Sequence, residues 1–332
     1  MYSKFAPFSL KNNTLFSKEF DDLYSSVKGA VAECNHVFIK GNNLNERFEN
    51  LRENSKFYIG EIGFGIGINF LTTCKSWLNH TKQNQVLEFY SFDKYLFRLS
   101  DFKTLNVSCP DLKEYISELE RNYPRNIQGA QKISLFGGRI ILNLIIGEID
   151  NTQEYIKLMD KVDAWYFDGF SPSKNPDLWS IKLFKCIHKS CHENTTFSTY
   201  TSSGLVKNNL TESGFNHSRA MGFSDKRHML KGTVDTQLKK NTSNTKVAVI
   251  GSGIAGCVLS YTLAKKGIEV DLYEKSDSIC SGASSHELLV TYPRLSAHDT
   301  AFGSFTLHSY IFATNFYKQL KTDSWKKSCI LR

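Results

Sequence analysis

The sequence lacks the features that mark membrane and secreted proteins. No uninterrupted apolar run approaches the roughly 20 residues that span a bilayer, and the opening residues MYSKF contain no apolar stretch of the signal-peptide kind. No internal repeat and no low-complexity tract is present. We therefore expect a cytoplasmic protein without a membrane segment.

The cysteines also lack a repeated pairing pattern, and their scatter is typical of reduced thiols rather than of a disulfide framework. No disulfides are therefore predicted. The eight cysteines are Cys34, Cys74, Cys109, Cys186, Cys191, Cys257, Cys280 and Cys329.

One group of possible metal ligands lies close together in the sequence. Its members are Cys186, His188, Cys191 and His192. All four are expected in or near one helix, whereas tetrahedral zinc sites usually draw ligand pairs from two separate elements. No metal site is predicted.

The length and the charge set broad limits on what is present. The 332 residues are enough for about two domains, and 41% hydrophobic residues are enough to give each domain a core. Residues 233–245, TVDTQLKKNTSNT, are polar and have neither a helical nor a strand period, which predicts a linker. The predicted domains are therefore residues 1–232 and residues 246–332.

The formal charge of +8 would favour a polyanion such as RNA, although charge alone fixes neither fold nor specificity. Basic residues near the domain boundary form a candidate RNA-facing strip, with an ordinary solvated surface as the alternative. These residues are Arg219, Lys226, Arg227, Lys231, Lys239, Lys240 and Lys246.

A first nucleotide-binding pattern begins at residues 57–62, which have the apolar character of a strand. Three alternating glycines follow, Gly63, Gly65 and Gly67, and a helix can begin near Asn69. Glycines at such a junction let the backbone turn sharply and approach a ligand that a β-carbon would exclude. The pattern predicts a nucleotide site, although turns of this kind also occur for packing reasons alone.

Two further expected strands end in carboxylates. Residues 87–92 lead into Asp93, which at the carboxyl end of a parallel strand can accept hydrogen bonds from both hydroxyls of a ribose. Residues 140–146 lead through Gly147 into Glu148, which either contacts an adenine amino group or lies in a solvated loop.

Residues 162–179, VDAWYFDGFSPSKNPDLW, carry the most informative motif. Their first half reads as a buried strand with Asp168 at its carboxyl end, where doubly wound sheets place ligands and chemistry. Pro172 and Pro176 exclude a helix across the loop, and Asp177 is expected to cap a helix that starts at the next residue. Asp168 is the predicted catalytic residue, and an aspartate that only forms a turn is the alternative.

A second nucleotide-binding pattern follows the predicted linker. A strand over 246–250, a helix over 257–266 and a strand over 270–273 form a βαβ unit, and Glu274 follows at the spacing of a ribose-binding carboxylate. In this context dinucleotide binding is favoured over glycines that serve packing alone. The glycines of the fingerprint are Gly251, Gly253 and Gly256.

Together these motifs resemble the family of bifunctional tRNA 5-methylaminomethyl-2-thiouridine biosynthesis proteins, MnmC. The resemblance rests above all on residues 168–179, together with residues 61–70 and 91–94, and it covers essentially the whole chain. The flanking segments 20–24 and 226–230 agree with it. Asp93 and Glu148 depart from the family, which tends to carry Glu and Asp at these positions.

The resemblance implies an α/β fold, in which a Rossmann-like S-adenosylmethionine-dependent methyltransferase domain precedes an incomplete FAD-binding Rossmann segment. It implies methyl transfer to the primary amine of 5-aminomethyl-2-thiouridine at the wobble position of tRNA, with the anticodon loop as partner. Asp168 would accept a hydrogen of the amine, orient its lone pair or take its proton, and Tyr200 would line the same pocket.

The resemblance also implies the cofactor ligands. Those for S-adenosylmethionine are Glu61, Gly63, Gly65, Gly67, Asn69, Asp93 and Glu148. Those for FAD are Gly251, Gly253, Gly256, Glu274 and Ser284.

In the family, the FAD-dependent domain removes the carboxymethyl group of 5-carboxymethylaminomethyl-2-thiouridine. About 90 residues follow the predicted linker, fewer than a full FAD domain needs, so we expect the oxidative activity to be lost or impaired and FAD to be held poorly. Two other functions stay open, a small-molecule amine methyltransferase on the same fold and a non-catalytic protein that binds nucleotide or RNA.

Overall fold

The computed structural model describes residues 3–11, 14–26, 29–106, 109–159, 161–235, 246–265, 267–295, 300–320 and 325–326. The chain divides into two compact units, which are described separately: Met1–Gln237 with Leu295–Arg332, and Leu238–Arg294. Residues 236–245 of the predicted linker, with Lys239 and Lys240, lie outside the described residues, as does Cys329.

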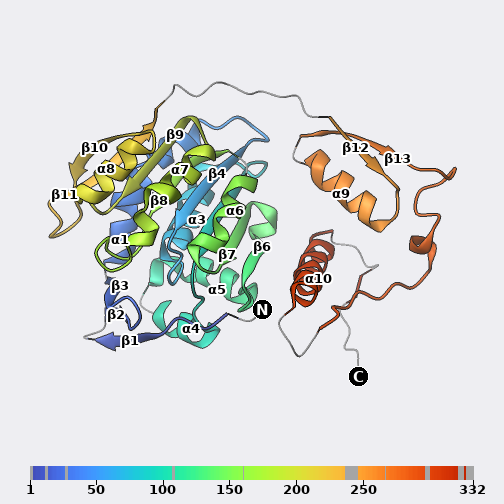
Figure 1. Cartoon of the computed structure of the whole chain (residues 1–332), viewed down its shortest axis with the longest axis horizontal. Helices are drawn as coiled ribbons and strands as arrows, with labels where there is room; N and C mark the ends of the chain where they lie inside the picture. The colour runs from blue at the N-terminus through green and yellow to red at the C-terminus, as the bar shows by residue number, and fades with distance from the viewer. Residues whose placement is uncertain are drawn as a thin grey trace. The chain divides into compact units, whose positions relative to one another are not determined.

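The first unit is built on an eight-stranded sheet whose centre is parallel (Figure 1). Its outer strands β6, β10 and β11 are antiparallel to their neighbours, and β11 extends through the first two residues of the segment predicted as a linker. From edge to edge the strands are β10 (Phe215–Met221), β11 (His228–Val234), β9 (Cys191–Thr199), β8 (Val162–Phe167), β4 (Lys56–Ile62), β5 (Val86–Asp93), β7 (Ile140–Ile146) and β6 (Gly129–Leu135).

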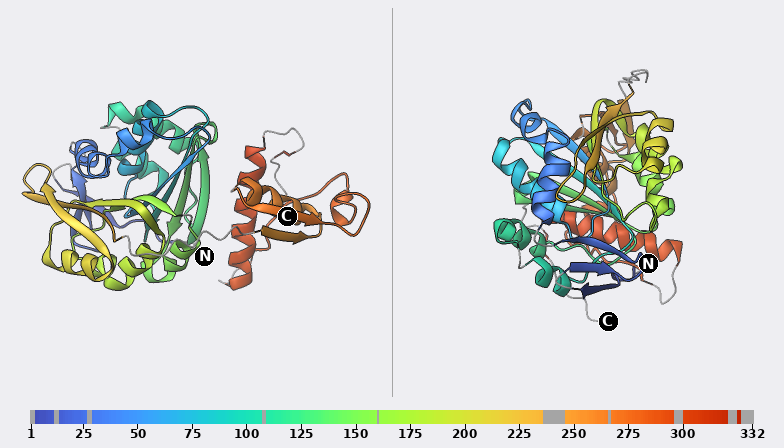
Figure 2. Two further views of the ribbon diagram at one scale, coloured as in Figure 1. Left: turned by 90° about the horizontal axis from the view of Figure 1, so that it is seen from above. Right: turned by 90° about the vertical axis from the view of Figure 1, so that its left-hand side faces the viewer.

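Helices cover both faces of this sheet (Figure 2). The central strands are consequently apolar at almost every position, as in the sequence IILNLII of β7. One face carries α1 (Ala30–Cys34), α2 (Leu44–Glu49), α3 (Ile68–His80), α4 (Leu99–Asn106) and α5 (Lys113–Arg121). The other carries α6 (Ile149–Leu158), α7 (Ile181–Lys189) and α8 (Gly204–Glu212).

A hydrophobic core lies on each side of the sheet. Phe57 and Phe89 pack under Trp77 of α3 on one side, and Trp165 and Phe167 pack towards α7 on the other. The expected α/β fold is therefore confirmed, together with the predicted strands over 57–62, 87–92, 140–146 and 162–167.

The helix after the Asp168 loop begins later than predicted. A single 3-10 turn, η4 (Pro176–Trp179), comes first, and α7 is capped by Ser180, whose hydroxyl accepts a hydrogen bond from the Leu183 amide. The prediction that Asp177 caps the helix was wrong. Proline fixes φ and lacks an N–H, which suits the first position of this short turn.

A small antiparallel sheet precedes the large one in the chain. Its strands are β1 (Phe8–Lys11), β2 (Thr14–Ser17) and β3 (Asp22–Ser26), and a π-helix, η1 (Asn35–Lys40), follows α1.

The second unit contains the predicted βαβ arrangement. Strands β12 (Lys246–Ile250) and β13 (Glu269–Tyr273) are parallel, and α9 (Ile254–Lys265) connects them. The helix begins three residues before the predicted 257, and Lys266 lies outside the described residues. The single turn η5 (Ala283–Ser285) follows β13.

Helix α10 (Ala301–Gln319) belongs to the first unit, although it follows the second in the chain. Leu307 and Ile311 pack against Ile127, and the Asn315 amide donates to the Lys132 carbonyl of β6 at 3.1 Å. Among the described residues, no helix combines the length and the apolar character needed to cross a bilayer.

Candidate active site

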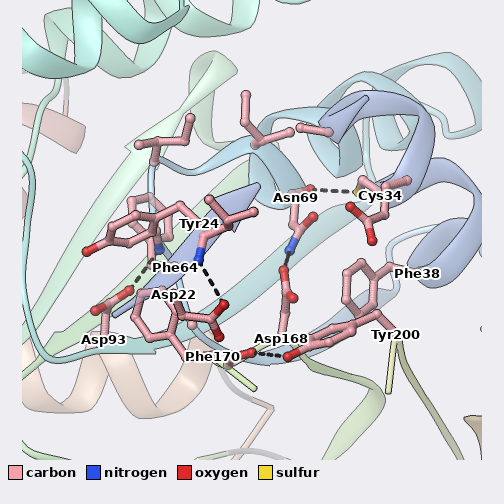
Figure 3. Close-up of a pocket in the computed structure, with 18 of the residues that line it drawn as sticks. Asp22, Tyr24, Cys34, Phe38, Phe64, Asn69, Asp93, Asp168, Phe170 and Tyr200 are labelled. Atoms are coloured by element: carbon pink, nitrogen blue, oxygen red, sulfur yellow. Dashed lines mark hydrogen bonds between the residues drawn. The ribbon is translucent and has the colours of Figure 1, made fainter. Parts of the chain in front are cut away.

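A cavity of about 380 Å³ lies at the carboxyl ends of β4, β5 and β8 (Figure 3). Its volume is within the usual range for small-molecule and cofactor sites. The structure brings most of the predicted site residues of the first unit to its wall. These are Gly63, Gly65, Asn69, Asp93, Asp168 and Tyr200.

The glycine turn is closely packed at its first residue and less tightly packed at its second. Gly63 has φ 97°, and a β-carbon there would lie 1.8 Å from the Asp168 carbonyl oxygen. Gly65 has φ 54°, and the nearest atom to its would-be β-carbon is Tyr24 Cδ1 at 3.7 Å. The end of β4 can therefore approach the end of β8 only because Gly63 lacks a side chain.

Two predicted residues lie outside the cavity wall. Gly67, with φ 78°, is the N-cap of α3, and Glu61 is fully buried within β4. One oxygen of Glu61 accepts a hydrogen bond from the Ser91 hydroxyl at 2.5 Å, while Oε1 has no hydrogen-bond partner among the described residues. Burial, with a smaller contribution from Asp168, raises the pKa of the Glu61 carboxyl to about 8.

Asp93 ends β5 and reaches the glycine turn. Its Oδ2 accepts the Gly65 amide at 2.8 Å and its Oδ1 accepts the Tyr95 amide at 3.1 Å. Burial raises the pKa of the Asp93 carboxyl to about 6, and these backbone hydrogen bonds limit the rise. The carboxylate is thus fixed beside the turn at the position predicted for a ribose ligand.

Asp168 follows β8 and lies next to Asn69 and Tyr200 (Figure 3). The Asn69 amide donates to Asp168 Oδ2 at 2.6 Å. Burial raises the pKa of the Asp168 carboxyl to about 7, the Asn69 hydrogen bond and Lys226 lower it, and Glu33 raises it. The carboxyl group can therefore gain or lose a proton near neutral pH.

Tyr200 forms a rigid wall beside Asp168. Its hydroxyl donates to the Gly169 carbonyl oxygen at 2.8 Å, and its ring meets Trp179 edge-on at 6.1 Å between centroids. Burial raises the pKa of the Tyr200 phenol above its ordinary value. The side chain therefore stays neutral and presents an aromatic face.

The segment before β4 supplies a wall that the sequence patterns did not identify. Asp22 Oδ2 accepts the Ser171 amide at 2.8 Å, and the Tyr24 ring meets Phe170 edge-on at 4.9 Å. Glu33 and Cys34 of α1 also line the cavity. The sequence signal for this segment was the family resemblance of residues 20–24, Glu33 and residues 37–38, which carried no role for these side chains.

Lys226 lies at the cavity rather than in an outward strip of basic residues. It lines the cavity from the turn between β10 and β11, and its ammonium is 2.8 Å from Glu33 Oε1. Of the other residues predicted for that strip, Arg219 and Lys231 are exposed on β10 and β11, and Lys246 pairs with Glu269 and Asp271 in the second unit.

Glu148 is not brought into the cavity wall. Its carboxylate pairs with the Lys94 ammonium at 2.7 Å, and 58% of the side chain is exposed. Lys94 also pairs with Glu19 at 2.6 Å. Glu148 therefore has a charged partner in solvent, and its adenine contact stays a prediction.

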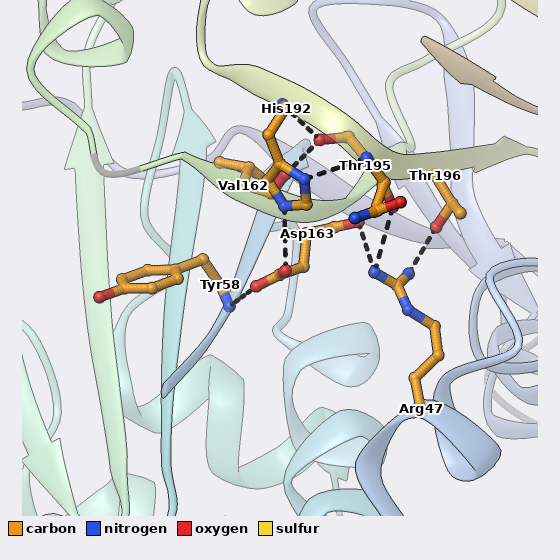
Figure 4. Close-up of polar contacts among 8 residues, drawn as sticks. Arg47, Tyr58, Val162, Asp163, His192, Thr195 and Thr196 are labelled. Carbon is orange, nitrogen blue, oxygen red and sulfur yellow. Dashed lines mark hydrogen bonds and ion pairs between the residues drawn. The ribbon is translucent and has the colours of Figure 1, made fainter. Parts of the chain in front are cut away.

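A polar cluster lies near the amino-terminal ends of β4 and β8 (Figure 4). Asp163 accepts the Tyr58 amide at 2.7 Å and lies 3.0 Å from His192 Nε2, while Arg47 donates to Thr196 Oγ1 at 2.8 Å. These contacts tie strands together rather than form a site. His192, which is one of the four possible metal ligands, is thus paired with Asp163.

The described residues contain no group of three or more His, Cys, Asp or Glu side chains placed to hold a metal ion. The Cys186 thiol donates to the Gln153 carbonyl and the Cys191 thiol donates to the Ile187 carbonyl. All seven described cysteines are free thiols.

In the second unit, a cavity of about 700 Å³ lies beside the second glycine turn and is lined by Gly251, Gly253, Glu274 and Ser284. One oxygen of Glu274 accepts the Ser252 amide at 2.8 Å and the Ser252 hydroxyl at 2.7 Å. These hydrogen bonds lower the pKa of the Glu274 carboxyl to about 2.

The fifth predicted residue of this unit, Gly256, has a packing role. A β-carbon there would lie 1.8 Å from the Gly251 carbonyl oxygen, so the glycine lets α9 approach the turn. Ser284 Oγ accepts the Ile254 amide at 3.0 Å, at the first turn of the same helix.

Comparisons with known proteins agree with this architecture. Residues 110–235 match a family of S-adenosyl-L-methionine-dependent methyltransferases, and residues 249–320 match an NAD(P)-binding Rossmann-like domain. The crystal structure of MNMC2 from Aquifex aeolicus has a TM-score of 0.52 and 22% identity, covering 70% of this chain and 71% of that one. The Rossmann-like methyltransferase fold with a partial second nucleotide-binding segment is confirmed.

Two relatives share the name tRNA 5-methylaminomethyl-2-thiouridine biosynthesis bifunctional protein MnmC. The protein of Marinomonas sp. (strain MWYL1) is 36% identical over 322 residues, which cover 92% of this chain and 47% of the relative. The protein of Legionella pneumophila (strain Lens) is 34% identical over 333 residues, which cover 92% of this chain and 50% of the relative. The chain thus spans about half the length of these relatives.

Proposed function

Because this chain is a homologue of the MnmC family, we propose that its first unit methylates the primary amine of 5-aminomethyl-2-thiouridine at the wobble position of tRNA. The observation that carries the proposal is the half-buried Asp168 carboxyl, with a pKa of about 7, in the wall of a cavity that also contains the glycine turn. A methyl donor and a proton acceptor can meet in that cavity.

The residues of the first unit fit S-adenosylmethionine. Gly65 lines the cavity, and Asp93 is held beside it at the end of the neighbouring strand, at the place expected for a ribose acceptor. The bound donor would supply an activated methyl group: once the ammonium form of the amine has given up one proton, the freed lone pair forms the N–C bond and the C–S bond breaks with its electrons going to sulfur, which leaves a secondary ammonium and a neutral thioether.

Asp168 has the properties needed to receive that proton. The Asn69 hydrogen bond fixes one of its oxygens, and burial holds its pKa close to neutrality, where a general base works best. Tyr200 and Phe38 bound the same cavity with aromatic surface, which helps to exclude water. Holding nitrogen, methyl carbon and sulfur in line is worth several kcal/mol.

We also infer that the cavity of the second unit takes the adenosine diphosphate part of a dinucleotide, FAD by resemblance to the family. Gly251, Gly253, Glu274 and Ser284 around one cavity support this. The expected loss of the FAD-dependent oxidative step stays a prediction, and bound-flavin absorbance in the purified protein would contradict poor retention of FAD.

A radiolabelled methyl-transfer assay tests the proposed function. Labelled S-adenosylmethionine is supplied with tRNA that carries 5-aminomethyl-2-thiouridine and lacks only the final methyl group, with free polyamines or with no acceptor. We expect label in tRNA alone. Label in polyamine but not tRNA would favour a small-molecule amine methyltransferase, and label in neither would leave a nucleotide- or RNA-binding protein.

The Asp168→Ala variant tests the residue that carries the proposal. We expect methylation to fall by roughly 10²–10⁴-fold, as for loss of a general base, while calorimetry shows unchanged binding of S-adenosylmethionine. Asp111→Ala, an exposed aspartate outside the cavity, is the control. Near-normal turnover of Asp168→Ala would remove this residue from the mechanism.

A further inference from the structure

A cation site is built into the wall of the active-site cavity, and the ammonium of Lys226 fills it. Lys226 Nζ lies 2.8 Å from Glu33 Oε1 and 4.1 Å from the centroid of the Tyr200 ring. All three side chains line the cavity that also contains Asp168. A carboxylate and an aromatic face around one point form a well-understood binding site for an organic cation.

Tyr200 and the backbone that carries Glu33 are held in place without help from the lysine. The Tyr200 hydroxyl is bonded to Gly169, its ring packs on Trp179, and Glu33 extends from α1, which packs against α3. Lys226 is different, because it comes from the turn between β10 and β11 and 47% of its side chain is exposed. The lysine can therefore leave while the Tyr200 ring and the backbone of Glu33 stay in place, and the Glu33 carboxylate is then available to another cation.

The proposed acceptor carries the same chemical group as the lysine. A primary aminomethyl group is an alkylammonium when protonated, like the end of a lysine side chain. Both Glu33 and Lys226 influence the charge of Asp168, which places this cation site within electrostatic reach of the proposed base. A cation bound there would lie near the group that is to take its proton.

We propose that Lys226 is a placeholder: its ammonium fills the subsite that the aminomethyl group of the acceptor occupies during the reaction, with Glu33 and Tyr200 as the acceptor-binding residues. This inference rests on the proposed function. Exchange of one ammonium for another leaves the net charge of the cavity unchanged, so Asp168 meets the acceptor in the same electrostatic setting as in the free protein.

The rival role for Lys226 is a contact to a tRNA phosphate. The two roles predict opposite effects of removing Lys226 on the affinity for the acceptor. Removal of a placeholder strengthens acceptor binding, because the acceptor no longer has to displace an ion pair, whereas removal of a phosphate contact weakens it. A nucleoside acceptor without any phosphate separates the two roles further.

The test is calorimetric titration of 5-aminomethyl-2-thiouridine nucleoside into protein loaded with S-adenosylhomocysteine. We expect Glu33→Gln to weaken nucleoside binding by roughly tenfold or more, as for loss of a partly buried charged partner. Lys226→Gln should strengthen it by roughly threefold to tenfold. Lys157→Gln and Glu154→Gln, which break an exposed ion pair on α6, should leave it unchanged.

The same variants are compared for the KM of tRNA that carries 5-aminomethyl-2-thiouridine, and binding of S-adenosylhomocysteine to each variant reports that the cavity is intact. Weaker nucleoside binding by Lys226→Gln, unchanged binding by Glu33→Gln, or no nucleoside binding by the unaltered protein would each overturn the placeholder inference. Failure of the unaltered protein to methylate tRNA would instead refute the proposed function, and the nucleoside titrations would still decide the cation site.

Discussion

The two glycine turns of this chain begin with the same backbone conformation and have opposite electrostatics. Gly63 and Gly251 have φ values of 97° and 96°, and each turn connects the first strand of a parallel pair to a helix. In both units a carboxylate at the carboxyl end of the second strand of the pair, Asp93 or Glu274, accepts a backbone amide of the turn. Yet the pKa is raised to about 6 for Asp93 and lowered to about 2 for Glu274.

Burial accounts for the difference. β4 pairs with strands on both sides and α3 buries eight residues, whereas among the described residues β12 pairs with β13 alone and α9 has no buried residue. Desolvation therefore dominates at Asp93 and hydrogen bonding dominates at Glu274. A glycine motif sets the backbone conformation, and the surrounding sheet sets the chemistry of the carboxylate.

The largest expected difference between the turns is in their tolerance of alanine. Gly63→Ala has to overcome both positive φ and a contact 1.8 Å from Asp168, whereas Gly251→Ala has nothing within 4 Å of the new β-carbon. We expect losses of roughly 3–5 kcal/mol at Gly63 and about 1–2 kcal/mol at Gly251. Native-state hydrogen exchange measures the free energy of unfolding of each unit in the two variants. Equal losses at Gly63 and Gly251 would contradict this prediction.

Raised carboxyl pKa values predict that the first unit loses stability as pH rises. Folded Asp168 holds its proton up to about pH 7, whereas the unfolded chain releases it near pH 4, so stability falls between these values. Asp168→Asn removes this penalty. We expect its Tm to exceed that of the unaltered protein by roughly 4 °C or more at pH 8 and to match it near pH 4. A gain in Tm that does not depend on pH would show that the ionisation of Asp168 is not its cause.

The same carboxyl should set the pH dependence of methyl transfer. Because Asp168 must be ionised to take a proton, kcat/KM is expected to rise with pH and to level off above about pH 7. Lys226→Gln should move the midpoint upward and Glu33→Gln downward, each by less than about one pH unit. Glu274→Gln in the second unit is the control, and it should leave the midpoint in place.

The smallest expected effect lies in the second unit and has the opposite sign. Hydrogen bonds that lower the pKa of Glu274 stabilise its loop above the ordinary pKa, and this contribution is lost as pH falls towards 2. Glu274→Gln should speed amide exchange at Ser252 and Ser276 a few-fold at pH 7, with a smaller difference at pH 3. Exchange that is the same with and without the carboxylate at pH 7 would contradict this.

The sequence predicted the parts of the site that depend on local pattern. Glycine spacing and apolar runs located the turn at Gly63 and the strand ends at Asp93 and Asp168, because parallel strands bring their carboxyl ends to one edge. The wall formed by Glu33 and Lys226 could not be predicted, because its two members are 193 residues apart and meet only through the packing of α1 and the β10–β11 turn.

Glu148 illustrates the limit of position alone. It does follow a central strand, as predicted, yet Lys94 at the end of the neighbouring strand is also within reach and pairs with it. Asp177 shows the same limit in another way. An aspartate commonly caps helices, but Asp177 lies inside the 3-10 turn that begins at Pro176, and Ser180 caps α7 instead. For Asp177 a neighbouring residue took the predicted role, whereas the adenine contact of Glu148 stays a prediction.

The contact between α10 and β6 has a consequence for self-association. β6 is an edge strand of the large sheet, and the unpaired backbone carbonyl and amide groups of an edge strand can pair with a strand of another chain. The side chains of His308 and Asn315 in the helix are hydrogen-bonded to the carbonyl oxygens of Gln128 and Lys132. This margin of the sheet is thereby blocked against strand addition from a second molecule, which is how natural sheets avoid aggregation.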